Sequence, residues 1–108
     1  KDAVNNYDED LFIFMHHPLY AEDINETKST WNIDKEPRLE IIDILSNHNK
    51  SVNIFSGHMH QNKTNKYKNI NNIIVSSIGV PLGNDPSGYY YADYENNSLN
   101  YKFKILGE

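Results

Sequence analysis

Two histidines spaced one residue apart, His58 and His60, are the residues of this sequence best suited to chemistry. They follow Gly57 and the strand-like run 52–55. Neutral imidazole is a common ligand for zinc, manganese and iron, and two histidines on a glycine turn have little reason in packing alone. We expect Gly57 to let the backbone turn sharply and approach an ion closely. The spacing predicts that His58 and His60 point in different directions and serve two neighbouring ions.

A second histidine pair, His16 and His17, stands at the end of another expected strand. It follows the continuous apolar run Leu11–Met15 and precedes Pro18, which stops sheet pairing. A run of this kind predicts a strand buried on both faces. A lone His-His-Pro segment is more often an ordinary strand end. However, sites in open α/β sheets form just outside the carboxyl ends of strands, so the two pairs together predict a shared metal site.

A loop and a helix separate the two histidine pairs. Residues 19–34 are polar and predict a surface loop. Asp34 is a candidate N-cap for a helix that begins near Pro37 and ends near Ser46, with an apolar face spaced at helical intervals. His48 follows this helix among Asn and Lys residues, which predicts a solvated side chain that interacts favourably with the helix dipole.

The remaining elements complete an α/β pattern. Residues 70–77 contain another strand-like run, and residues 79–88 are rich in Gly, Pro and Asp, which predicts an ordered loop. Residues 89–94 and 99–105 alternate like the two arms of an antiparallel hairpin. The order of strand, loop, helix, strand and then several strands predicts an α/β fold with a mixed sheet.

The composition excludes several classes of function. The chain has 108 residues, a formal net charge of −5 and one arginine, Arg38. It therefore lacks the clustered cations of a nucleic-acid or anionic-membrane surface, and a site for phosphates would draw its attraction from bound metal cations. The absence of cysteine excludes disulfides, cysteine zinc sites and a thiol nucleophile, and it fits a cytoplasmic location. No apolar run approaches the length of a membrane span.

The two histidine motifs resemble those of a known superfamily. His16-His17-Pro18 resembles the His-x-Pro motif, and Gly57-His58-Met59-His60 the Gly-His-x-His motif, of the calcineurin-like metallophosphoesterases. The similarity runs from Leu11 to about Leu106 and is strongest to the calcineurin-like phosphoesterase domain-containing proteins, which include Ser/Thr-directed phosphatases. Further stretches support it: Trp31-Asn32-Ile33 with Arg38 downstream, Ser76-Ser77-Ile78-Gly79, and Leu82-Gly83-Asn84-Asp85-Pro86-Ser87-Gly88.

This resemblance implies a role for each histidine. His16 and His58 would bind one metal ion and His60 a second, with the two ions drawn from manganese, iron or zinc. His17 would be a catalytic group facing the substrate, although a polar residue bonded to backbone is an equal alternative. The implied chemistry is in-line attack on phosphorus by a hydroxide that bridges the ions. Gln61 departs from the Arg expected after Gly-His-x-His, which leaves one phosphate contact in question.

Several motifs of the superfamily have no counterpart in this sequence. The Asp-x-His, Gly-Asp and Gly-Asn-His elements, which precede His-x-Pro, supply the bridging carboxylate, an Asn ligand and the usual acid–base histidine. We therefore expect residues 1–108 to be the C-terminal part of one phosphoesterase domain, a four-layer α/β/β/α sandwich. The expected partners are the N-terminal half of that domain, without which the chain is inactive, and a phosphorylated substrate.

Three functions remain open on these residues. The first is a metal-dependent phosphomonoesterase, with a Ser/Thr phosphoprotein phosphatase as one form of it. The second is a phosphodiesterase of the cyclic-nucleotide type on the same fold. The third is a metal-binding or interaction module that kept the histidines without the carboxylates.

Overall fold

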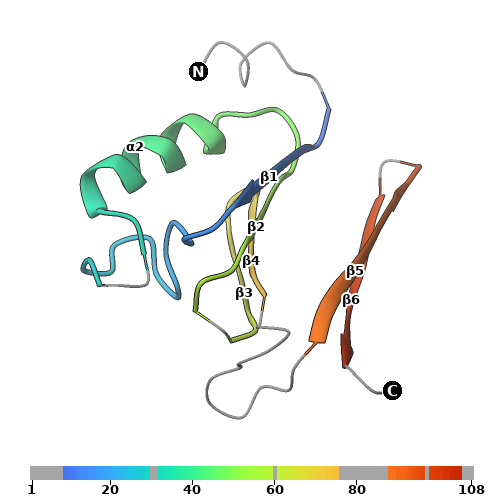
Figure 1. Cartoon of the computed structure of the whole chain (residues 1–108). Coiled ribbons are helices and arrows are strands. Elements are labelled where there is room, and N and C mark those ends of the chain that lie inside the picture. The colour runs from blue at the N-terminus through green and yellow to red at the C-terminus, as the bar shows by residue number, and fades with distance from the viewer. Residues whose placement is uncertain (1–8, 30–31, 60, 76–87, 97, 106–108) are drawn as a thin grey trace.

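The computed structural model describes residues 9–29, 32–59, 61–75, 88–96 and 98–105 (Figure 1). Their elements, in chain order, are β1 (Leu11–Met15), α2 (Lys35–Ser46), β2 (Val52–Ser56), β3 (Lys63–Tyr67), β4 (Ile70–Ile74), β5 (Gly88–Glu95) and β6 (Ser98–Ile105). Within these ranges, no helix has the length and apolar character that a bilayer crossing requires. The expected anchor Trp31 and nearly all of the expected loop 79–88 lie outside the described residues.

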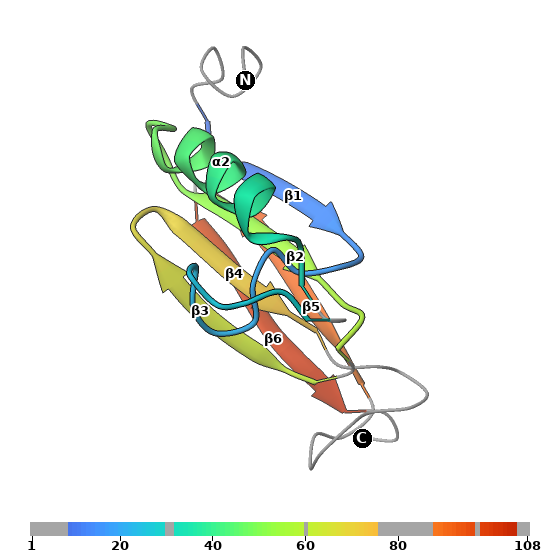
Figure 2. The same cartoon turned by 90° about the vertical axis from the view of Figure 1, so that its left-hand side faces the viewer.

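A four-stranded mixed sheet forms the centre of the fold. Its strand order is β1-β2-β4-β3, with β1, β2 and β4 parallel and β3 antiparallel to β4. Helix α2 covers one face of this sheet, and the β5–β6 hairpin stands opposite the other face (Figures 1 and 2). The predicted mixed α/β sheet is therefore confirmed, as are the helix and the antiparallel hairpin.

The core lies between α2 and the sheet. Ile42 and Leu45 of α2 are one helical turn apart and both are buried, as the helical spacing of the apolar residues predicted. They pack with a cluster of buried residues from the sheet and from the segment after β1, namely Leu19, Tyr20, Val52, Ile54 and Ile70. Strand β2 is buried along most of its length because it lies between two parallel neighbours.

The prediction that β1 is buried on both faces is wrong. Phe14 is 77% exposed, and the remaining residues of β1 are half-buried. Leu11, Ile13 and Met15 pack against the core, whereas Phe14 stacks on Phe55, with ring centroids 5.3 Å apart. The reason is topological: β1 is an edge strand of the described sheet, and the hairpin only partly covers its second face.

Two further features differ from the sequence predictions. Strand β3 was not predicted, because Lys63–Tyr67 is polar and lacks an apolar run; antiparallel pairing with β4 holds it as an edge strand. His48 was predicted to be solvated but is buried, with its Nε2 2.7 Å from the carbonyl oxygen of Glu9. That contact ties the end of α2 to the segment before β1, so His48 has a structural role.

Candidate metal centre

Parallel pairing of β1 and β2 brings the two histidine motifs together. Met15 stands opposite Ser56 at the carboxyl ends of these strands. The pairing continues one residue beyond the strands, because the backbone N–H of Gly57 donates to the carbonyl oxygen of His16 at 3.0 Å. The His16-His17 segment and the Gly57-His58 segment therefore leave the sheet side by side.

Three histidines form a close cluster at this edge. His16 Nε2 lies 3.1 Å from His58 Nδ1, and the ring centroids of His17 and His58 are 3.9 Å apart. One ring nitrogen from each of His16, His17 and His58 can be chosen so that all lie within 4.8 Å of one another. Two histidine nitrogens bound to one first-row ion at about 2.0–2.1 Å stand about 3 Å apart. The donors and their spacing thus fit a metal ion.

The backbone at the cluster is left-handed at His58, not at Gly57. His58 has a φ of 66°, in the left-handed region that non-glycine residues seldom occupy. A Cβ added to Gly57 would meet no atom within 4 Å. Gly57 was predicted to provide the sharp turn; it begins this turn, since the backbone N–H of Met59 donates to its carbonyl oxygen at 2.7 Å, while the left-handed conformation falls on His58. Uncommon backbone conformations of this kind cluster at functional sites, which agrees with a role for His58.

The environment of His17 favours its neutral form. Loss of solvent around the ring lowers the pKa of His17, and charge interactions with His58, His16 and Lys28 lower it further. A neutral imidazole has one nitrogen free to bind an ion or accept a proton. His17 is half-buried and contacts the rings of both neighbouring histidines, so it belongs to the cluster as much as His16 does.

An open hollow of about 510 Å³ lies beside the cluster. Its lining includes His16, Gly57 and the buried Ser56. The Ser56 hydroxyl has no hydrogen-bond partner among the described residues.

The predicted site residues fall into two groups. The structure brings His16, His17 and His58 together, whereas His60 lies outside the described residues. The division of the ligands between two ions stays a prediction. Within the described ranges the cluster contains no Asp or Glu. One nearby residue was not predicted at all: Lys28, whose place in a polar loop carries no signal of its closeness to His17.

Comparisons with known proteins find relatives of one kind. The chain is 38% identical over 77 residues to the serine/threonine-protein phosphatase CPPED1 of Pongo abelii, covering 70% of this chain and 24% of that protein. It is 34% identical over 96 residues to the protein of the same name in Mus musculus, covering 89% of this chain and 30% of that protein. To the protein of that name in Danio rerio it is 23% identical over 106 residues, covering 98% of this chain and 34% of that protein. The chain thus spans about a quarter to a third of the curated relatives it matches. No family model matches the chain, and neither does a solved structure.

Proposed function

We propose that this chain, which belongs to the calcineurin-like phosphoesterases, is the C-terminal part of a metal-dependent phosphatase domain and forms one wall of its binuclear metal centre. The observation that carries this proposal is the cluster of His16, His17 and His58 at the carboxyl ends of two parallel strands. Three imidazoles this close have no packing rationale, but they match the needs of a borderline-soft divalent ion.

The proposed substrate is a phosphomonoester on a serine or threonine of a protein. The relatives are named serine/threonine-protein phosphatases, and the histidine cluster lies at an open edge of the sheet where His16 is exposed. A phosphorylated side chain on a flexible peptide segment can reach such an edge. A phosphodiester substrate has no comparable support from the described residues.

Each histidine has a proposed task. His16 and His58 would hold one ion, since two of their ring nitrogens lie 3.1 Å apart, and His60 would hold the second. When bound, the two ions lower the pKa of a water molecule to the neutral range and neutralise charge on the phosphoryl oxygens. The lowered pKa of His17 favours its neutral form, in which the ring would donate one N–H to the substrate or accept a proton at the other nitrogen.

The remaining ligands are proposed to come from the N-terminal half of the same domain. The described cluster offers imidazoles but no carboxylate, and a pair of ions needs an anionic bridge to be held closely together. The aromatic sheet face, defined here as Phe12, Phe14 and Phe55, is partly uncovered. In the proposed four-layer α/β/β/α domain, strands of the N-terminal half cover this face and bring the carboxylates to the histidines.

Hydrolysis by the full-length protein tests the proposal. We expect manganese- or iron-supported hydrolysis of p-nitrophenyl phosphate, loss of this activity with a chelator, and loss of it in His58→Ala. Lys66→Met is a matched control, because Lys66 is exposed on β3 and contributes no ligand. Unchanged turnover in His58→Ala would refute the assignment. Faster hydrolysis of bis(p-nitrophenyl) phosphate than of the monoester would show that the protein is a phosphodiesterase. Metal binding without hydrolysis of either ester would show that it is a non-catalytic module.

A further inference from the structure

A second cavity shares His17 with the histidine cluster. It has a volume of about 340 Å³ and is lined by His17, Lys28, Asn32, Ile33, Asp34 and Pro37. Because His17 also contacts His58, a phosphoryl group at the cluster has this cavity as its neighbour. Consecutive Cα atoms of a peptide are about 3.8 Å apart. The cavity therefore lies within reach of the residues that flank a phosphorylated side chain bound at the cluster.

One exposed ion pair sets the charge of this cavity. Lys28 Nζ lies 2.9 Å from Asp34 Oδ1, and both side chains are 60% exposed. Among the residues that line the cavity, Lys28 is the only one with a fixed positive charge. An exposed pair of this kind is weak, and an ammonium group has three N–H donors. Lys28 can therefore bind a second carboxylate without a large rearrangement.

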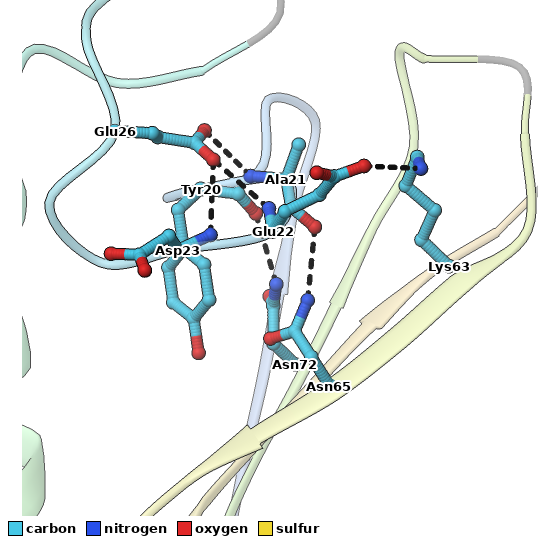
Figure 3. A network of polar contacts seen from close by, with 8 residues as sticks. All are labelled: Tyr20, Ala21, Glu22, Asp23, Glu26, Lys63, Asn65 and Asn72. Atoms are coloured by element: carbon cyan, nitrogen blue, oxygen red, sulfur yellow. Dashed lines mark hydrogen bonds and ion pairs between the residues drawn. The ribbon is translucent and has the colours of Figure 1, made fainter.

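The wall that carries Lys28 is held by hydrogen bonds within the loop, so the cavity is formed before a substrate arrives. The carboxylate of Glu26 accepts hydrogen bonds from the backbone N–H of Ala21, Glu22 and Asp23 (Figure 3). It also accepts one from the Asn32 side chain, at 2.6 Å. Asn32 is buried and lines the cavity, so the loop around Lys28 closes on itself.

Arg38 and the sheet fix the same loop from two other sides. The guanidinium of Arg38 is fully buried and donates to the carbonyl oxygens of Ile24, Glu26 and Ile33. On the sheet side, two asparagine side chains donate to the start of the loop: Asn72 to Tyr20 O and Asn65 to Ala21 O, each at 2.9 Å (Figure 3). The described parts of this loop, residues 20–29 and 32–34, are thus anchored on three sides, and a preformed binding surface favours selective binding.

We infer that this cavity is a specificity subsite that takes an acidic side chain next to the phosphorylated residue of the substrate, with Lys28 as the residue that recognises it. The inference rests on the proposed phosphatase function. Asp34 opposes Lys28: its carboxylate pairs with Lys28 in the free protein and repels an incoming acidic group. The two residues are thus expected to change substrate preference in opposite directions.

The test compares two phosphoserine peptides on the full-length protein. They are identical except that one has Asp and the other Lys beside the phosphoserine, and the ratio of their kcat/KM values is measured. We expect the wild type to prefer the acidic peptide. Lys28→Met should reduce that preference by about threefold to fivefold, chiefly through KM, as expected for loss of one exposed ion pair. Lys28→Glu should reverse it.

A second variant keeps the test decisive if changes at Lys28 disturb the loop. Asp34 caps α2 by position but makes no side-chain capping hydrogen bond, so Asp34→Asn should leave the fold intact and raise the preference for the acidic peptide. Lys66→Met is again the control, with no change expected. Equal ratios in wild type, Lys28→Met and Asp34→Asn would overturn the subsite while p-nitrophenyl phosphate hydrolysis persists. Absence of all hydrolysis in wild type would overturn the phosphatase proposal itself.

Discussion

His16 Nε2 and His58 Nδ1 lie 3.1 Å apart although 42 positions of sequence separate them. The contact follows from the parallel register of β1 and β2, which places Met15 opposite Ser56, and from the left-handed backbone at His58. Two imidazole nitrogens at this distance can form a hydrogen bond or bind one metal ion together. The relationship makes the metal-binding proposal testable without any assay of activity.

Metal binding should stabilise the full-length protein. A ligand that binds only the folded state at about 100 times its Kd adds about 2.7 kcal/mol. We therefore expect manganese to raise the Tm in thermal unfolding, and we expect His58→Ala to abolish this shift. Lys66→Met should keep it. A Tm shift that persists in both His16→Ala and His58→Ala would show that the ion binds elsewhere.

Removal of the buried guanidinium should be strongly destabilising. Arg38 is fully buried and donates to the carbonyl oxygens of Ile24, Glu26 and Ile33. Arg38→Met leaves these acceptors without their donor, at about 1–3 kcal/mol for each buried group. We expect a total loss of about 3 kcal/mol or more in urea unfolding. Lys35→Met, on the exposed side of α2, should change the unfolding free energy by less than about 0.5 kcal/mol. Similar losses for the two variants would contradict the stabilising role of the Arg38 hydrogen bonds.

Arg38 also marks the limit of what the sequence could predict. The strand ends and the helix follow from local apolar patterns, and the meeting of the histidines follows from the α/β order. An arginine in a helix, by contrast, is mostly exposed. No local pattern shows that carbonyl groups up to 14 positions earlier in the sequence will surround the guanidinium. His48 differs from prediction for a similar reason, since its partner Glu9 lies 39 positions away. Strand β3 is polar, and only its pairing with the adjacent strand β4 makes it a strand.

Glu26 should make stability depend on pH in the acid range. Burial alone raises the pKa of Glu26, but hydrogen bonds from the Asn32 side chain and from three backbone N–H groups outweigh it and lower the pKa. A carboxyl whose pKa is lowered in the folded state stabilises the protein above the unfolded pKa of about 4.3. That stabilisation is lost as the pH falls through the folded pKa.

Urea unfolding of wild type and Glu26→Gln measures this effect. We expect the wild type to lose stability faster than the variant as the pH falls from about 5 to about 3. Above that range the variant should be the less stable protein, because glutamine keeps one acceptor oxygen and its NH2 group cannot accept the hydrogen bonds made to the second carboxylate oxygen. Parallel pH profiles for the two proteins would contradict the assigned role of Glu26.

Two glycines should respond differently to substitution by alanine. A Cβ at Gly88 would lie 2.2 Å from the carbonyl oxygen of Lys104 and 2.5 Å from Phe103 Cζ. One of these is backbone, so the β5–β6 pair must shift, at a cost of about 1–3 kcal/mol. Gly57 has open space around it, so Gly57→Ala should leave the unfolding free energy nearly unchanged. Equal loss in the two variants would argue against the close approach of β6 to Gly88.

The aromatic sheet face provides the test of whether further strands cover this chain in the full-length protein. Phe14 is 77% exposed and stacks on Phe55, so its replacement in an uncovered chain should change the unfolding free energy by less than about 0.5 kcal/mol. If an N-terminal half packs on this face, Phe14→Ser opens a cavity in a core, at about 3–5 kcal/mol by analogy with Phe→Ala. Tyr91 of the hairpin, which is 57% exposed, supplies the control as Tyr91→Ser. We expect the Phe14 variant of the full-length protein to be far less stable than the Tyr91 variant, because in the proposed domain an N-terminal half covers this face and supplies the carboxylates of the metal centre.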